Sequence, residues 1–155
     1  MYKKIFVTAF LLCWKIYFPQ TICKLYFHHS NSVIPLSSID ISFEPIKNNK
    51  KGKVRVIVKK SRDDKYIYRI SREKFSEIFN ACLKIKSDTI AVKYTLIDAS
   101  SSDILLIDSF GIKKKYNTDG LNKRSQNNEQ QNNFWYSTTL IMKAAKLKME
   151  DLIDY

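Results

Sequence analysis

The chain has 155 residues, of which 45% are hydrophobic, and it carries a formal net charge of +12. Its length suits one domain, and its apolar content is sufficient for a hydrophobic core, which excludes a wholly disordered chain. With three glycines and three prolines, it is not a collagen-like or linker-like sequence. The excess of lysine favours an acidic partner, although compositional bias in the source genome would produce the same excess.

The N-terminal region combines a basic start with a long apolar stretch. Lys3 and Lys4 precede the uncharged residues 5–14, which is the pattern of the first two parts of a signal peptide. No cleavage site of the small-x-small kind follows. Lys15 and Pro19 interrupt the longer apolar stretch, so it would be a poor membrane span.

From this pattern we expect residues 1–30 to be a targeting or anchoring segment, such as a signal peptide or signal anchor, and residues 36–155 to form a single domain. The alternatives are a translation start further along the chain and a buried helix of a cytosolic protein. His28 and His29 fall in the polar stretch that follows the apolar segment. We expect them to be exposed linker residues rather than metal ligands, because a metal site needs three or four converging side chains.

Three segments alternate apolar and polar residues with the period of a β-strand. They span residues 38–46, 53–60 and 66–70, and polar stretches typical of turns separate them. The alternation predicts three consecutive strands, each with one apolar face.

A helix is predicted directly after the third of these strands. Ser71 is suited to cap it, and five apolar residues follow at helical spacing: Phe75, Ile78, Phe79, Cys82 and Leu83. Ser71 and Lys74 also match the Ser-x-x-Lys nucleophile motif, but the partner motifs of that machinery are absent. We therefore interpret Ser71 as a helix cap and Cys82 as a buried apolar side chain.

The second half of the chain predicts two further strands and one helix. Residues 89–98 alternate, and residues 103–116 begin apolar and end basic, which favours a strand that runs into solvent with Gly111 as a bulge. A polar loop at 117–133 and a helix at 134–147 follow. The order β-β-β-α-β-β-α predicts an α+β fold, with a mainly antiparallel sheet and two helices packed on one face.

The sequence contains no recognisable catalytic or cofactor-binding motif. Its cysteines lack paired or zinc-binding spacing, and it has no glycine-rich phosphate loop. Asp108, which interrupts an apolar strand, is the carboxylate that best suits a small carboxylate-dependent enzyme, the least favoured alternative. We expect no enzymatic activity, no cofactor and no metal ion.

Residues 47–65 contain nine lysines and arginines and two aspartates. This run favours a non-enzymatic binding protein, exported or membrane-anchored, that contacts an acidic protein partner as small immunity or inhibitor proteins do. The alternative is a cytosolic single-stranded nucleic-acid-binding protein, with Tyr66, Tyr68 and Tyr94 stacking on bases. The residues expected to contact the partner are Lys50, Lys51, Lys53, Arg55, Lys59, Lys60, Tyr66, Tyr68 and Trp135.

Overall fold

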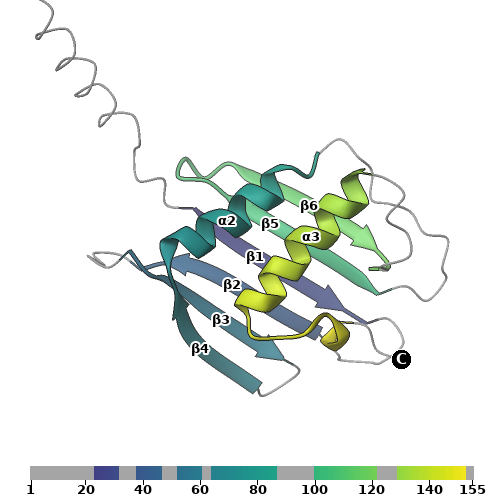
Figure 1. Ribbon diagram of the computed structural model, residues 1–155, viewed down its shortest axis with the longest axis horizontal. Helices are drawn as coiled ribbons and strands as arrows, with labels where there is room; N and C mark the ends of the chain where they lie inside the picture. Colours follow the sequence, from purple (N-terminus) through teal and green to yellow (C-terminus); the bar gives the residue numbers. More distant parts are fainter. Residues whose placement is uncertain are drawn as a thin grey trace, which may run out of the picture.

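The computed structural model describes residues 23–31, 38–46, 52–60, 64–86, 100–121 and 129–152. These residues form a six-stranded antiparallel sheet and two α-helices in the order β-β-β-β-α-β-β-α, which confirms the predicted α+β class (Figure 1). The strands are β1 (Lys24–Ser30), β2 (Ser38–Pro45), β3 (Val54–Lys60), β4 (Asp64–Ile70), β5 (Ser101–Ile107) and β6 (Lys113–Asp119). The helices are α2 (Arg72–Leu83) and α3 (Glu129–Ala144), and the short 3-10 helix η2 (Met149–Asp151) follows them.

The strand order across the sheet is β4-β3-β2-β1-β5-β6. β1 therefore lies at the centre of the sheet, paired on one side with β2 and on the other with β5. The expectation that residues 1–30 lie outside the domain is wrong for Lys24–Ser30. Leu25 and Phe27 are buried in the core at 0% and 1% exposure. Their alternation is hidden in the sequence because Tyr26 between them is also aromatic. Residues 1–22 lie outside the described residues.

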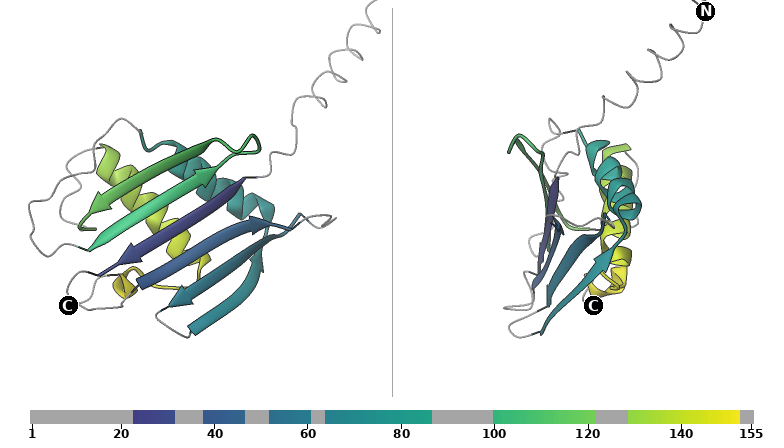
Figure 2. Two further views of the ribbon diagram at one scale, coloured as in Figure 1. Left: turned by 180° about the vertical axis from the view of Figure 1, so that it is seen from behind. Right: turned by 90° about the vertical axis from the view of Figure 1, so that its left-hand side faces the viewer.

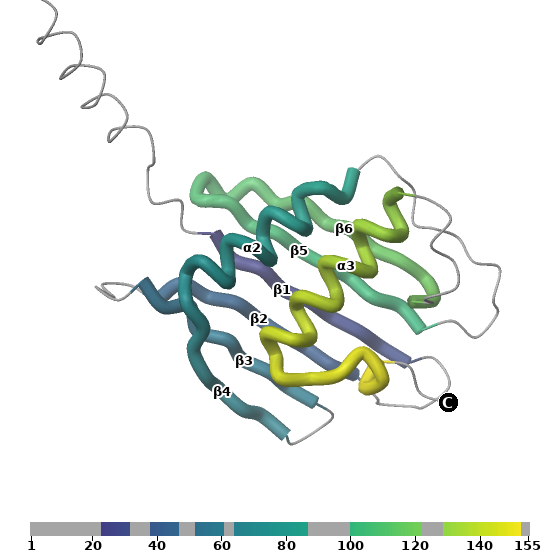
Figure 3. Tube along the Cα trace, viewed as in Figure 1, coloured from purple at the N-terminus to yellow at the C-terminus, as the bar shows by residue number. Residues whose placement is uncertain are grey.

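The sheet and the helices form two layers. α2 and α3 lie side by side and cross the same face of the sheet, as the ribbon and the Cα trace both show (Figures 2 and 3). Alternate residues of each strand point into the space between the layers and form the core, which includes Phe27, Ile41, Phe43, Val56, Val58, Ile104 and Leu106. No element of the described part of the chain covers the opposite face, which we call the uncovered face.

A β-hairpin takes the place of the single strand that was predicted for residues 103–116. β5 and β6 pair with each other and are joined by the turn Asp108–Ile112. The Asp108 carboxylate accepts hydrogen bonds from the backbone N–H groups of Phe110 and Ile112, at 2.8 and 2.9 Å. Gly111 has a φ of +82°, which favours glycine, so this residue turns the chain instead of forming a bulge within one strand.

Two other segments differ from their predicted boundaries. The polar stretch 117–133 is shorter than expected as a loop, because its first three residues end β6 and Glu129–Asn133 begin α3. The strand predicted at 89–98 lies outside the described residues.

The start of α2 has the predicted cap. The Ser71 hydroxyl accepts a hydrogen bond from the backbone N–H of Lys74 at 3.2 Å. Ser71 therefore caps the helix as expected. Cys82 on the same helix is fully buried, and burial raises the pKa of its thiol to about 12. Among the described helices, none has both the length and the apolar character needed to cross a bilayer.

Candidate functional site

The predicted binding residues fall on both faces of the sheet. In β3, Val54, Val56 and Val58 are buried beneath the helices, so Arg55 and Lys59 lie on the uncovered face. Lys53 is exposed directly before this strand. The other two lysines of the basic run that were included in the prediction, Lys50 and Lys51, lie outside the described residues.

Lys60, Tyr66 and Tyr68 belong instead to the helix-covered side. Tyr66 and Tyr68 stand opposite Val58 and Val56 in the sheet register, which places them on the same face as these buried valines. Lys60, Tyr66 and Tyr68 therefore lie on the opposite face of the sheet from Arg55 and Lys59, because side chains alternate between faces along a strand.

Contacts with the helical layer hold Tyr68 and Lys60 on this side. The Tyr68 hydroxyl donates a hydrogen bond to the carbonyl oxygen of Ala144 at 2.6 Å, and the Lys146 ammonium lies 4.9 Å from the Tyr68 ring centroid. Burial raises the pKa of Tyr68 to about 12. The Lys60 ammonium lies 2.8 Å from the Asp151 carboxylate in η2, and the pKa of Asp151 is lowered by this contact. These contacts join the edge of the sheet to the C-terminal part of the helical layer.

Trp135 is also separate from the basic strands. It lies on α3, between the buried Phe134 and the exposed Tyr136, and is itself partly buried. An aromatic platform beside the cations of β3 is therefore not formed by Tyr66, Tyr68 or Trp135.

The structure instead brings six side chains of β3 and β4 together on the uncovered face. We call this set the β3–β4 patch; its members are Arg55, Ile57, Lys59, Lys65, Ile67 and Arg69. In the register, Arg55 stands opposite Arg69, Ile57 opposite Ile67, and Lys59 opposite Lys65. The patch therefore consists of two basic pairs on either side of an apolar pair.

Ile67 and the cations of the patch are open to solvent, whereas Ile57 is half-buried. Ile67 is 55% exposed, and all four basic residues are classed as exposed. The ion pairs found among the described residues are His28–Asp40, Lys60–Asp151 and Lys115–Asp103, and none of them includes a cation of the patch. Sequence reasoning had found only Arg55 and Lys59, because the contribution of β4 depends on the cross-strand register.

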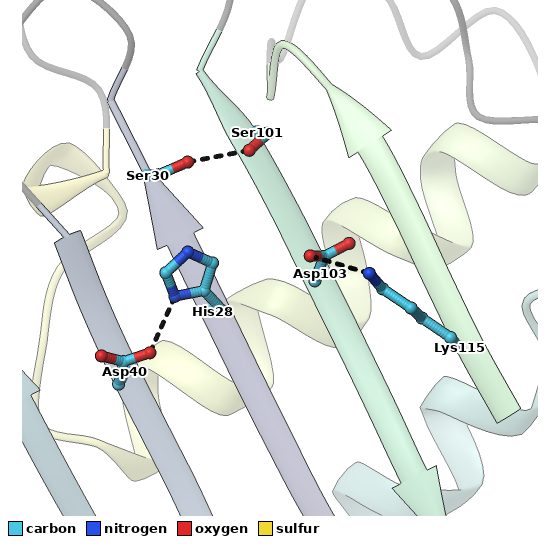
Figure 4. Close-up of polar contacts among 6 residues, drawn as sticks. All are labelled: His28, Ser30, Asp40, Ser101, Asp103 and Lys115. Atoms are coloured by element: carbon cyan, nitrogen blue, oxygen red, sulfur yellow. Dashed lines mark hydrogen bonds and ion pairs between the residues drawn. The ribbon is translucent and has the colours of Figure 1, made fainter. Parts of the chain in front are cut away.

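The centre of the uncovered face is polar. His28 Nδ1 lies 2.7 Å from Asp40 Oδ1, and Lys115 Nζ lies 3.2 Å from Asp103 Oδ2 (Figure 4). The Ser30 and Ser101 hydroxyls are 2.8 Å apart on the same face. These cross-strand pairs satisfy one another, and within the described ranges no cluster of three or more His, Cys, Asp or Glu side chains is placed to hold a metal ion.

The two histidines are strand residues rather than exposed linker residues. The His28 side chain is 45% exposed on the uncovered face, whereas His29 is 3% exposed and faces the helices. His29 Nδ1 lies 2.8 Å from the Ser102 hydroxyl in the core. The linker interpretation failed because two adjacent histidines resemble a polar break, although one of them continues the buried row of Leu25 and Phe27.

A second exposed feature is the turn between β5 and β6. Phe110 is 85% exposed and Ile112 is 59% exposed. Sequence reasoning missed this turn, although an aspartate followed by glycine three residues later, between two strand-like segments, is a hairpin signal. Asp108, the carboxylate considered in the least favoured, enzymatic alternative, accepts hydrogen bonds from the turn amides described above.

Comparison of the sequence with models of known protein families and with curated proteins finds no match. The proposed function therefore rests on the arrangement of the side chains.

Proposed function

We propose that the protein is a non-enzymatic binding protein that contacts an acidic segment of another protein through the β3–β4 patch. The N-terminal sequence further supports action outside the cytoplasm or at a membrane, where small immunity or inhibitor proteins offer an analogy of size and charge. The observation that carries the proposal is the two cross-strand pairs of like charge, Arg55 with Arg69 and Lys59 with Lys65.

Like charges that stand directly opposite each other destabilise a sheet. On β2, Glu44 and Asp40 stand opposite Arg55 and Lys59, but the Asp40 carboxylate is already engaged by His28. In the described part of the chain, β4 is the last strand of the sheet, so no described acidic residue pairs with Lys65 or Arg69 across its outer edge. An acidic partner would relieve this repulsion, which supports a partner of that charge.

The apolar pair supports a protein partner over a simple anion. Ile57 and Ile67 lie between the two basic pairs, so a complementary segment needs an apolar side chain flanked by acidic ones. Burial of exposed isoleucine surface contributes to affinity, and the flanking charges fix the register. A nucleic-acid strand would gain less from isoleucines, since bases are held mainly by stacking on aromatic rings.

The position of β4 suggests how such a segment would bind. As an edge strand, β4 presents main-chain groups along its outer side, and an extended peptide can add to such an edge as a further strand. Alternate residues of the added strand would then lie beside Lys65, Ile67 and Arg69. We therefore expect the recognised segment to follow the pattern acidic-x-apolar-x-acidic.

The proposal is tested by fluorescence anisotropy with a labelled peptide containing Glu-Thr-Leu-Thr-Glu. A peptide of the same composition with its two glutamates adjacent serves as the control, together with labelled oligo-dT. We expect the alternating peptide to bind more tightly than both controls. In the variant Arg55→Glu/Arg69→Glu, we expect its affinity to fall about ten-fold or more, as removal of a charged contact at an interface would give.

A matched variant separates the patch from general charge. Lys84→Glu/Lys143→Glu makes the same change in net charge at exposed positions of the helical layer. We expect it to bind the alternating peptide nearly as well as the natural protein does. Equal losses in the two variants, or preferred binding of oligo-dT, would show that the patch is not a site for acidic protein segments.

A further inference from the structure

The hairpin turn holds the most exposed of the large apolar side chains that the structure describes. Phe110 is 85% exposed and Ile112 59%. All seven positions from Ser109 to Lys115 are classed as exposed. Single exposed apolar residues are common on proteins, but an aromatic and an aliphatic side chain together at the end of a hairpin indicate a contact surface.

The turn is built so that these side chains face outward. The Asp108 carboxylate accepts hydrogen bonds from two turn amides, and the backbone N–H of Gly111 donates to the Asp108 carbonyl oxygen at 3.1 Å. The N–H of Asp108 in turn donates to the carbonyl oxygen of Ile112 at 3.1 Å. The negative charge of Asp108 is therefore engaged by the turn amides, and the apex consists of Ser109, Phe110 and Gly111.

Lysines lie directly behind this apex. Lys113 and Lys114 follow Ile112, and since side chains alternate along β6, they lie on opposite sides of the hairpin. Lys24, the first residue of β1, stands opposite Ile107, which in turn stands opposite Lys113. We call Lys24, Lys113 and Lys114 the basic collar; all three are exposed and take part in none of the ion pairs among the described residues.

We propose that the hairpin turn inserts Phe110 and Ile112 into the interface of an anionic lipid bilayer, while the basic collar contacts the lipid headgroups. This inference does not depend on the β3–β4 patch. Apolar side chains at the boundary of the acyl chains, with lysines at headgroup level, form the arrangement by which peripheral proteins bind such membranes. Each lysine near an anionic leaflet adds to the attraction.

The position of the turn favours a membrane over a protein pocket. The start of β1 lies at the same end of the sheet as this turn (Figures 1 and 2). Burial raises the pKa of the Cys23 thiol, and the nearby charge of Asp108 raises it further, in line with this proximity. Cys23, the residue to which the apolar N-terminal sequence is joined, therefore lies near the exposed turn, so a membrane-associated N-terminus would bring the turn to the same surface.

The test uses the full chain and vesicles of phosphatidylcholine with and without phosphatidylserine. We expect co-flotation with the vesicles that contain phosphatidylserine, weakened by added salt. The variant Phe110→Asn/Ile112→Asn should lower this binding about ten-fold or more, because both side chains lose their apolar burial. The control Leu83→Asn/Tyr136→Asn changes two exposed apolar residues on the helices and should bind like the natural protein.

A second variant reports insertion without removing the apolar side chain. In Phe110→Trp, the added tryptophan emission should shift to shorter wavelength and be quenched by brominated lipids, whereas in Tyr136→Trp it should not. The proposal is wrong if the natural protein binds vesicles with and without phosphatidylserine equally or not at all. It is also wrong if Phe110→Asn/Ile112→Asn binds the vesicles as tightly as the natural protein, or if brominated lipids do not quench Phe110→Trp. It is also wrong if Phe110→Asn/Ile112→Asn still binds the vesicles but no longer binds a protein partner.

Discussion

Each strand of the sheet has one row of side chains beneath the helices and another on the uncovered face, and the two rows differ in burial and in their role in stability. In β3, Val54, Val56 and Val58 are 3%, 0% and 0% exposed, whereas Arg55 and Lys59 between them are exposed. The covered row contributes most of the burial that stabilises the fold. The uncovered row is therefore free to carry unfavourable neighbours, and the two opposed pairs of like charges lie there.

The largest difference in stability between substitutions on the two faces should come from truncating a buried aromatic side chain. Phe43 is fully buried, with its ring centroid 6.0 Å from that of Phe75. Phe43→Ala should lower the free energy of unfolding by about 3–5 kcal/mol, because it leaves a cavity between the layers. Ile57→Ala on the uncovered face should cost about 1 kcal/mol or less. Urea unfolding followed by circular dichroism measures both, and equal losses would contradict the assignment of the faces.

The adjacent histidines give the next comparison. His29 is buried against the Ser102 hydroxyl, whereas His28 is paired with Asp40 at the surface. His29→Ala should cost about 1–3 kcal/mol, because it removes the partner of a buried hydroxyl. His28→Ala should cost about 1 kcal/mol or less, as is typical of an exposed polar pair. Chemical denaturation of the two variants measures both losses of stability. A larger loss in His28→Ala than in His29→Ala would contradict the assignment of the two histidines to opposite faces.

The hydroxyl of Tyr68 links the edge strand to the helical layer. Tyr68→Phe should cost about 1 kcal/mol, since it removes the hydrogen bond to Ala144. The pKa of Tyr68 is raised from 10 to about 12 in the folded protein. The unfolded chain therefore loses this proton first, so the contribution of Tyr68 to stability is present below pH 10 and is lost as the pH rises towards 12.

Denaturation curves between pH 9 and pH 12 measure this effect. The alkaline loss of stability should be smaller in Tyr68→Phe than in the natural protein, although the raised pKa of Cys82 will leave part of it. An identical alkaline loss in both proteins would show that Tyr68 does not titrate in this way.

The smallest expected change in stability is an increase instead of a loss. Arg69→Glu places an acidic side chain opposite Arg55 and removes one like-charged pair. It should raise the free energy of unfolding by about 0.2–1 kcal/mol at low salt, and added salt should diminish the gain. The same substitution should weaken binding of the acidic peptide. A variant that is less stable at low salt would contradict the repulsion on which the proposed function depends.

The periodicity of the sequence was sufficient for β2, β3, β4 and α2. β2, β3 and α2 each carry their own period of buried residues, whereas in β4 the helix-covered row of Tyr66, Tyr68 and Ile70 is only partly covered. The periodicity failed at β1 and at the β5–β6 hairpin. Leu25, Tyr26 and Phe27 are three consecutive apolar residues and do not show the alternation of a strand. Their role in a central strand depends on pairing with β5, more than seventy residues away. Such pairing cannot be deduced from the local sequence.

The candidate site was predicted only in part for a related reason. The basic run drew attention to Arg55 and Lys59, but the sequence was interpreted as a continuous charge cluster rather than as two alternating rows. The register decides that Lys65 and Arg69 join this surface and that Tyr68 leaves it. The exposure of Phe110 likewise depends on a turn that is formed by Asp108 and Gly111 together.

The most direct test of the binding account is to titrate the protein with the Glu-Thr-Leu-Thr-Glu peptide and follow its backbone amides by NMR. The two edge strands, β4 and β6, both carry basic residues, so they can be compared within one molecule. We predict the largest chemical-shift changes in Val54–Lys60 and Asp64–Ile70 and only small ones in Lys113–Asp119. Changes of similar size on β4 and β6 would contradict the account, because they would show that the peptide follows positive charge alone.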